Sequence, residues 1–109
     1  MLDVRYFVTE DGTSPFAEWL ASLDPRARAK VATAIVRMEK GNLSSVKSVG
    51  QGVLEYRIDF GPGYRVYFGR DGEVLVILLM GGTKKRQQRD IETASKYWQV
   101  YKQSKRTVH

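Results

Sequence analysis

Cysteine is absent from this sequence of 109 residues, and histidine occurs once, at the final position. Without cysteine the chain can form neither a disulfide nor a thiolate metal or redox site, and we expect a reducing compartment, the cytoplasm. No typical arrangement of metal ligands is visible, so we expect neither a metal nor a small-molecule cofactor. A pair of histidines that acts as general acid and base is excluded as well.

Long apolar runs are also missing. The longest one, residues 74–80, has seven residues, far fewer than the roughly 20 that span a bilayer. The first residues, MLDVRYF, lack the basic and then apolar order of a signal peptide. We therefore expect no membrane span and no secretion. The composition, 42% hydrophobic and 28% charged residues, is typical of a single globular domain, here residues 1–109.

Positive charge is concentrated near the end of the sequence. Residues 1–83 hold ten basic and ten acidic side chains, whereas residues 84–109 hold eight basic ones against Asp90 and Glu92. A polyanionic partner would explain this excess, because each neutralised phosphate releases counterions. A solvated basic tail explains the charge equally well.

Helix and strand signals alternate in the first 42 residues. Residues 3–9 are β-branched and aromatic, which is typical of a strand. Ser14-Pro15 and Asp24-Pro25 each combine an N-cap with proline at the first helical position. The apolar stripes that follow them predict two short helices, and the tight connection between these predicts a helical hairpin.

The second half of the chain predicts mostly strands. From residue 53 the hydrophobic period changes to two, and turn residues at 61–63 and 71–72 divide the run into three strands. Residues 42–52 are small and polar, which is typical of a loop. A last helix is expected from Lys84, and residues 104–109 are expected to fray.

These elements predict an α+β fold. We expect an antiparallel sheet made of the N-terminal strand and a three-stranded meander, with the helical hairpin packed on it and a C-terminal helix. Strand 74–80 is apolar on both faces, so we expect it to be central and covered by helices on at least one side.

Polar residues gather on one face of the predicted meander. If the hairpin loop is residues 61–63, Asp59 lies opposite Arg65 and Arg57 lies opposite Tyr67. With Glu55 these side chains would form one polar cluster on a sheet face that is open to water. A structural ion pair between Asp59 and Arg65, which stabilises by about 0 to 1 kcal/mol, explains the pattern without any function.

Further cations follow the last predicted strand, which ends at Gly81-Gly82-Thr83. Lys84, Lys85 and Arg86 come directly after it, in a loop position where binding residues tend to lie. Together with the polar face, these cations suit a phosphodiester, because arginine binds phosphate oxygens bidentately and tyrosine can stack on a base or donate a proton.

The segment from Gly52 to Ile91 resembles the phage-derived, HigB-like killer-protein branch of the RelE/ParE toxin superfamily, whose members belong to type II toxin-antitoxin modules. The resemblance lies in the order "G-V-x-E-x-R", "F-G-P-G-Y-R-V-Y-F", "L-L-x-G-G-x-K" and "Q-x-D-I", and extends more weakly through the first strand and SPFAEWL. It implies a small domain with a helical hairpin on an antiparallel sheet, and an antitoxin partner, usually a helix-turn-helix protein.

The resemblance also implies an activity, which is the ribosome-dependent, metal-independent cutting of mRNA by attack of a 2′-OH on the adjacent phosphate. Such a reaction needs cations near the phosphorane and groups that transfer protons. By match to the GYR and G-x-K motifs, Arg65 and Lys84 stabilise the phosphate, with Arg57 as a third cation. Tyr67 is the first candidate for proton transfer, ahead of Asp90, which more simply complements the dipole of the last helix. Further expected RNA contacts are Lys47, Lys85, Arg86 and Arg89.

Two other functions stay open at this point. A ParE-like inhibitor of DNA gyrase would share the fold and lack nuclease chemistry. A regulatory domain that binds nucleic acid would use the same basic face without cutting anything. The presence of Arg57, Arg65 and Lys84 together favours the endoribonuclease over the gyrase inhibitor.

Overall fold

A computed structural model of the chain describes residues 1–107. Its elements, in chain order, are β1 (Asp3–Tyr6), α1 (Pro15–Ser22), α2 (Pro25–Glu39), β2 (Val46–Gly50), β3 (Val53–Ile58), β4 (Tyr64–Asp71), β5 (Leu75–Thr83), the 3-10 turn η1 (Lys84–Arg86) and α3 (Gln87–Thr107). The predicted α+β class is confirmed. The fraying expected for residues 104–109 falls partly on residues 108 and 109, which lie outside the described part of the chain.

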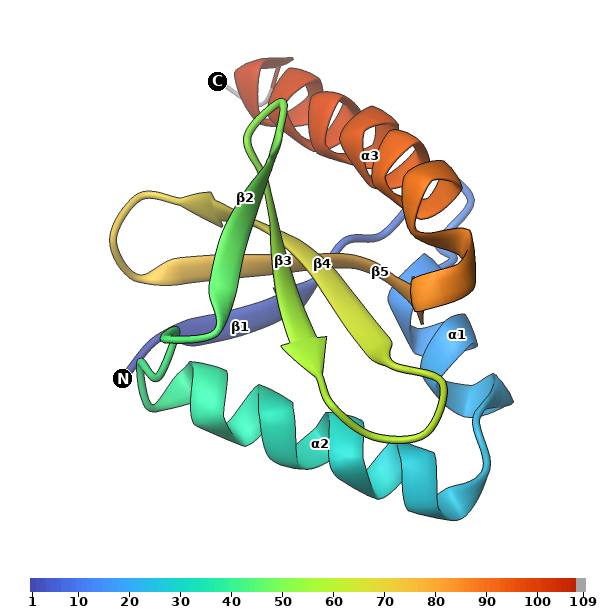
Figure 1. Ribbon diagram of the computed structural model, residues 1–109. Coiled ribbons are helices and arrows are strands. Elements are labelled where there is room, and N and C mark those ends of the chain that lie inside the picture. The colour runs from blue at the N-terminus through green and yellow to red at the C-terminus, as the bar shows by residue number, and fades with distance from the viewer. Residues whose placement is uncertain (108–109) are drawn as a thin grey trace.

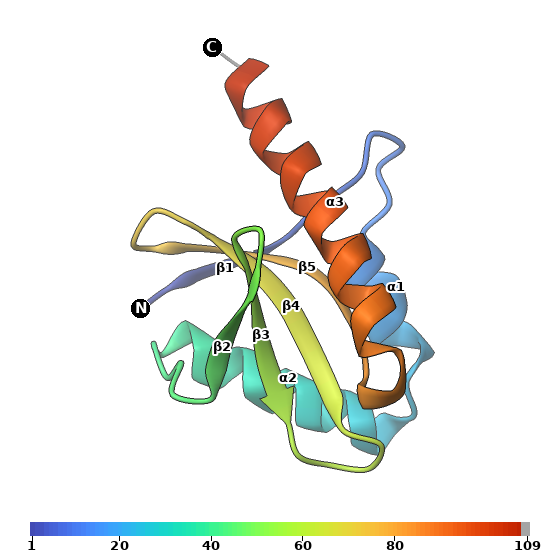
Figure 2. The same cartoon turned by 45° about the horizontal axis from the view of Figure 1, so that its top comes forward.

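The five strands form one sheet in the order β1-β5-β4-β3-β2. Helices α1 and α2 lie on one side of this sheet, and α3 crosses the other side (Figures 1 and 2). Strand β5 is an interior strand, as its two apolar faces predict, because it pairs with both β1 and β4. The sheet is therefore the middle of three layers.

Two details of the predicted sheet are wrong. Strand β1 pairs with β5 in parallel, and the expected loop 42–52 contains the edge strand β2, which pairs antiparallel with β3. Strands β2 to β5 pair antiparallel with one another in chain order. Strand β5 then lies beside β1 and runs in the same direction, so the sheet is mixed. Strand β2 has five residues, VKSVG, and Lys47 and Ser48 among them are polar. The segment therefore lacks the hydrophobic pattern by which a strand is predicted.

The helix starts follow the predicted capping pattern. The Ser14 hydroxyl accepts a hydrogen bond of 3.1 Å from the backbone N–H of Ala17, and the Asp24 carboxylate accepts one of 3.0 Å from Ala27. Each cap satisfies a backbone donor that the first helical turn leaves without a partner. The caps thus fix the residues at which α1 and α2 begin.

Each face of the sheet has its own buried cluster. The face toward α1 and α2 is apolar and includes Phe16, Val31, Val66, Phe68 and Leu78. The face toward α3 includes Phe7, Val53, Tyr67, Ile77, Leu79, Ala94 and Trp98. Both clusters exclude water from the strands between them, so β4 and most of β5 are buried.

Glycines let the helices approach the sheet closely. A Cβ on Gly81 would lie 2.2 Å from Cε3 of Trp19 in α1, and a Cβ on Gly69 would lie 2.4 Å from Cζ3 of Trp98 in α3. No side chain fits at either position, so each glycine is required by the tryptophan that packs on it. Among the described residues, no helix is both long and apolar enough to cross a membrane.

Candidate functional site

The hairpin between β3 and β4 sets the register of the polar face. Arg57 lies opposite Arg65 and Glu55 lies opposite Tyr67, so the expected pairing of Asp59 with Arg65 and of Arg57 with Tyr67 is wrong by two residues. The reason is the connection, which comprises the five residues 59–63 and leaves Asp59 in the loop. A shift of two residues keeps every side chain on its face.

The polar face is covered at Glu55, Arg65 and Tyr67, contrary to the expectation that it is open to water, whereas Arg57 and Asp59 are exposed. The side chains of Glu55, Arg65 and Tyr67 are 1%, 4% and 0% exposed. The cover is the start of α3, where the Gln87 amide donates a hydrogen bond of 2.7 Å to Oε2 of Glu55. These three side chains, which we call the polar cluster from here on, therefore lie in the layer between the sheet and α3.

Glu55 takes the place that the sequence assigned to Asp59. Its carboxylate lies 3.6 Å from Nε of Arg65 and 3.9 Å from Nζ of Lys47. A buried carboxylate needs such partners, because its desolvation is costly when no positive charge or donor is near. Glu55 shares a face with Arg57 by strand alternation, so the sequence predicted the face correctly but named the wrong partner for Arg65.

Arg65 and Lys84 meet at one backbone oxygen. The carbonyl of Gly63 accepts a hydrogen bond of 3.0 Å from Nη1 of Arg65 and another of 2.9 Å from the backbone N–H of Lys84. The Lys84 side chain is exposed, and so is Arg57, directly across the strands from Arg65. Like charges in opposite positions repel each other, and an anion between them would relieve this repulsion.

Three buried polar atoms of this region have no hydrogen-bond partner among the described residues. They are Nε of Arg65, Oη of Tyr67 and Oδ2 of Asp90. Buried groups of this kind are rare in folded proteins, and they are often found where a ligand or a reaction supplies the partner. These three atoms therefore make the region a candidate site.

Burial changes the acidity of two of these groups. Burial, with help from the carboxylates of Glu55 and Asp90, raises the pKa of Tyr67 far above its usual value. The Tyr67 hydroxyl therefore stays protonated at neutral pH, where it can donate a hydrogen bond and cannot act as a base. Burial also raises the pKa of Asp90, although Arg86 and Arg89 act in the opposite direction.

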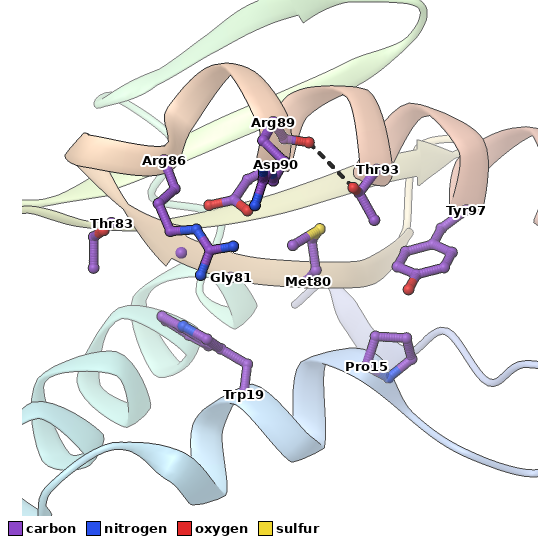
Figure 3. Close-up of a pocket in the computed structure, with 11 residues that line it drawn as sticks. Pro15, Trp19, Met80, Gly81, Thr83, Arg86, Arg89, Asp90, Thr93 and Tyr97 are labelled. Carbon is purple, nitrogen blue, oxygen red and sulfur yellow. Dashed lines mark hydrogen bonds between the residues drawn. The ribbon is translucent and has the colours of Figure 1, made fainter.

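A cleft of about 410 Å³ opens beside this cluster, between α1 and the start of α3. Its walls are aromatic, apolar and charged, and its floor is the end of β5 (Figure 3). Trp19 faces it from α1, and Arg86 extends from η1 toward Trp19 (Figure 3). Asp90 joins the cleft to the polar cluster, because a Cβ on Gly82 would lie 1.9 Å from its Oδ2, and Gly82 pairs with Arg65.

The remaining predicted RNA contacts divide into two groups. Lys85, Arg86 and Arg89 are exposed and line one open hollow on η1 and the first turn of α3. Lys47 lies apart from them on the edge strand β2, 57% exposed. Asp90 lies in the first turn of α3, where the sequence placed it, but burial dominates its pKa. The described residues contain no group of three or more histidine, cysteine, aspartate or glutamate side chains that could hold a metal.

Comparison with known proteins places this chain in a family. Residues 18–102 match the family described as "Phage derived protein Gp49-like (DUF891)". A protein of Haemophilus influenzae, described as "Uncharacterized protein", is 48% identical over 83 residues, which cover 75% of this chain and 84% of the relative. The family match runs from α1 into α3 and so includes every residue of the polar cluster and most of the cleft. This chain belongs to the phage-derived Gp49-like family.

Proposed function

We propose that this chain is the toxin of a toxin-antitoxin module and that it cuts mRNA on the ribosome without a metal. The observation that carries the proposal is the convergence of Arg65 and Lys84 on the Gly63 carbonyl, across from the exposed Arg57. Membership of a phage-derived family is in keeping with a toxin, and a helix-turn-helix antitoxin is the partner we expect. The wider relationship to RelE/ParE toxins is part of this proposal.

Cations suit the hardest step of the proposed reaction. Attack of a 2′-OH on the adjacent phosphate builds negative charge on a phosphorane, and preorganised positive charge lowers that barrier. Lys84 and Arg57 are exposed and can contact the phosphate directly. Arg65 is buried beside them and adds positive potential from below, where Glu55 and the Gly63 carbonyl hold its position.

Tyr67 is proposed as a donor to the reacting oxygens, and its burial sets a condition on this role. Arg65 and Tyr67 meet RNA directly only if η1 and the first turn of α3 move away from the sheet. Within residues 1–107, the side-chain hydrogen bond that ties this turn to the sheet is that of Gln87 with Glu55. Such a movement would break this hydrogen bond to a carboxylate, which contributes about 1.5–3 kcal/mol, and would also separate Asp90 from Gly82.

The exposed cations around this site are proposed to bind RNA. Lys85, Arg86 and Arg89 extend the positive surface from Lys84 along the first turn of α3, and Lys47 adds charge on the β2 side. Contacts of this kind to phosphates make affinity fall steeply as salt rises. We therefore expect binding to the ribosome and to RNA to depend strongly on ionic strength.

Primer extension on a reporter mRNA in a cell-free translation reaction tests the proposed function. Wild-type protein should cut the mRNA only when ribosomes are present, and Lys84→Ala should lower the rate of cutting by about 10²-fold. Lys40→Ala is the matched control, because Lys40 is an exposed lysine at the end of α2, in the opposite layer. Circular dichroism should show that all three proteins are folded.

Two outcomes would contradict the proposal. Intact mRNA with folded wild-type protein would remove the nuclease, and a DNA supercoiling assay would then test the gyrase inhibitor. Full cutting by Lys84→Ala would remove this residue from the phosphate site. Arg65→Ala is a second variant, but Arg65 is 4% exposed, so its loss of activity counts only if its circular dichroism is unchanged.

A further inference from the structure

The segment that covers the polar cluster has no apolar side chain. Residues 85–90, at the start of α3 and the end of η1, have the sequence KRQQRD. Four of them are exposed, whereas Gln87 is half-buried and Asp90 is buried. These two side chains reach the sheet, at Glu55 and at Gly82. Burial of apolar surface is the main force that holds one element on another, and this segment, which we call the lid, lacks it.

Closure of the lid buries polar atoms that have no partner. Asp90 packs on the backbone of Gly82, and its Oδ2 has no hydrogen-bond partner among the described residues. Within residues 1–107, Nε of Arg65 and Oη of Tyr67 beneath the lid lack one as well. Water would supply these hydrogen bonds if the lid opened. The closed position is therefore opposed by the atoms that it covers.

The lid is also a weak start for a helix. Thr83, at the N-cap position of η1, makes no capping hydrogen bond with its side chain in the described chain, whereas α1 and α2 both have a side-chain cap. A missing cap leaves backbone donors of the first turn without partners. Lys85, Arg86 and Arg89 place positive charge at the N-terminal end of α3, where the helix dipole disfavours it.

Stronger contacts hold the chain on both sides of the lid. Before it, the backbone N–H of Lys84 donates a hydrogen bond of 2.9 Å to the carbonyl of Gly63. After it, Ala94 and Trp98 are buried in the apolar cluster beneath α3. The lid can therefore leave the sheet while the rest of α3 stays in place. A local opening of this kind costs less free energy than unfolding of the whole domain.

We propose that the lid is closed in the resting chain and opens locally, and that its opening controls access to the polar cluster. Opening breaks the hydrogen bond between Gln87 and Glu55 and brings Arg65 and Tyr67 within reach of a ligand. When the competent form of a protein is a minor population, its apparent affinity falls with the fraction that is open. The role of opening in the cutting of mRNA rests on the proposed function, whereas the opening itself does not.

Thiol labelling measures the opening without ribosome or RNA. The chain has no cysteine, so Tyr67→Cys and Phe68→Cys each introduce a single thiol. Both positions are fully buried, the first beneath α3 and the second beneath α1 and α2. With iodoacetamide and mass spectrometry, Tyr67→Cys should react at least about tenfold faster than its own global unfolding allows. Phe68→Cys should react only through global unfolding, for which urea denaturation of each variant supplies the reference.

Gln87→Ala tests the side chain that holds the lid. Added to Tyr67→Cys, this change should speed the labelling about tenfold or more, because a hydrogen bond to a carboxylate is lost. Gln88→Ala is the matched control, since the neighbouring glutamine is exposed, and it should leave the rate unchanged. Labelling of Tyr67→Cys at no more than its rate of global unfolding would overturn the lid. Equal effects of Gln87→Ala and Gln88→Ala would do so as well.

Hydrogen exchange of the wild-type chain keeps the test decisive if Tyr67→Cys fails to fold. Opening of the lid breaks the helical hydrogen bonds that the amides of residues 91–93 make to carbonyls four residues earlier. These amides are the fifth to seventh of α3, and residues 29–31 are the fifth to seventh of α2. The first group should exchange about tenfold or more faster than the second, after correction for intrinsic rates. Equal protection of the two groups would overturn the lid.

The failure of the lid and the failure of the nuclease can be told apart. In the translation reaction, Gln87→Ala should cut mRNA faster than wild type and Gln88→Ala, because more of the chain is open. Local opening in a chain that leaves mRNA intact would support the lid and contradict the nuclease. Cutting of mRNA by the wild-type chain, with labelling of Tyr67→Cys only through global unfolding, would show that the closed form is active and that the lid is wrong.

Discussion

The two faces of the sheet differ in what they bury. The face under α1 and α2 buries an apolar cluster, which includes Val66 and Phe68 of β4. The face under α3 buries Arg65 and Tyr67 of the same strand, together with Glu55. Alternation along one strand thus sends apolar side chains to one helical layer and polar ones to the other.

This difference assigns separate tasks to the two layers. Burial of apolar surface stabilises the fold, whereas burial of polar atoms without partners costs free energy. We therefore expect the layer with α1 and α2 to contribute more to stability, while the layer with α3 holds the groups proposed as a site beside its own apolar cluster. Functional sites commonly break the rules of packing and are tolerated because the rest of the structure compensates.

The largest expected effect is on the apolar face. Phe68 is fully buried in the cluster under α1 and α2, so Phe68→Ala should lower the free energy of unfolding by about 3–5 kcal/mol. Urea denaturation followed by circular dichroism measures this change. A loss below about 1 kcal/mol would show that this layer does not hold the fold, and the assignment of tasks would be wrong.

The second effect is on the polar face and tests the register of the hairpin. Glu55→Ala leaves Arg65 without its carboxylate and Gln87 without its acceptor. Removing one partner of a buried ion pair should lower the free energy of unfolding by about 3 kcal/mol. Asp59→Ala, at the exposed loop position that the simple hairpin pairs with Arg65, should change it by less than about 0.5 kcal/mol.

The same urea titrations decide between the two registers. If Asp59→Ala proved the costlier change, Arg65 would be paired with Asp59 and the hairpin loop would be three residues long. A near-neutral Glu55→Ala would show instead that Arg65 finds another partner when Glu55 is removed.

Local signals in the sequence predicted the elements well. Caps at Ser14 and Asp24 begin the two helices where expected, and the period of two assigned the correct face to each residue of β3. Such signals depend on neighbours in the chain, so they can be read without the fold. The parallel pairing of β1 depends on residues more than 70 positions away, and no local signal carries it.

The covering of the polar face could also have been predicted in part. Gly69 and Gly82 lie on the face toward α3, and a side chain on either would overlap Trp98 or Asp90. Glycine inside a strand indicates the close approach of another element. If Gly82 is taken only as the end of a strand, it does not indicate this approach, and Arg65 is then expected on an open face.

A smaller effect concerns the pH dependence of stability. Burial raises the pKa of Asp90 above its usual value in the folded chain, so the folded state holds this proton more tightly than the unfolded state. The protonated Asp90 carboxyl therefore contributes to the free energy of unfolding below the usual pKa of about 3.9. This contribution is lost as the pH rises through the higher pKa of the folded chain. Asp90→Asn should therefore gain stability relative to wild type between pH 4 and pH 7 in urea titrations.

Asp71 gives the opposite sign and serves as the control for Asp90. Hydrogen bonds from Lys105 and Tyr101 lower the pKa of Asp71. The ionised Asp71 carboxylate therefore contributes to the free energy of unfolding above its usual pKa, and this contribution is lost as the pH falls. Asp71→Asn should be less stable than wild type at pH 7, and the two proteins should become equally stable in acid. If the free energies of unfolding of Asp90→Asn and wild type changed with pH in parallel, burial would not raise the pKa of Asp90.

The smallest expected effect on stability is also the one that separates fold from function most directly. Tyr67→Phe removes a buried hydroxyl that has no hydrogen-bond partner in the described part of the chain, and it keeps the volume of the ring. The free energy of unfolding should therefore stay the same or rise by up to about 1 kcal/mol. Tyr101→Phe, which loses a 2.7 Å hydrogen bond to Asp71, should instead lower the free energy of unfolding by about 1 kcal/mol.

The activity of the same variant tests the proposed role of Tyr67. If Tyr67 donates to the reacting phosphate, Tyr67→Phe should cut mRNA about 10²-fold more slowly in the translation reaction despite its undiminished stability. A destabilised Tyr67→Phe with full activity would make this tyrosine part of the scaffold, and the polar face would then lose its distinction from the apolar one at the position where the two differ most.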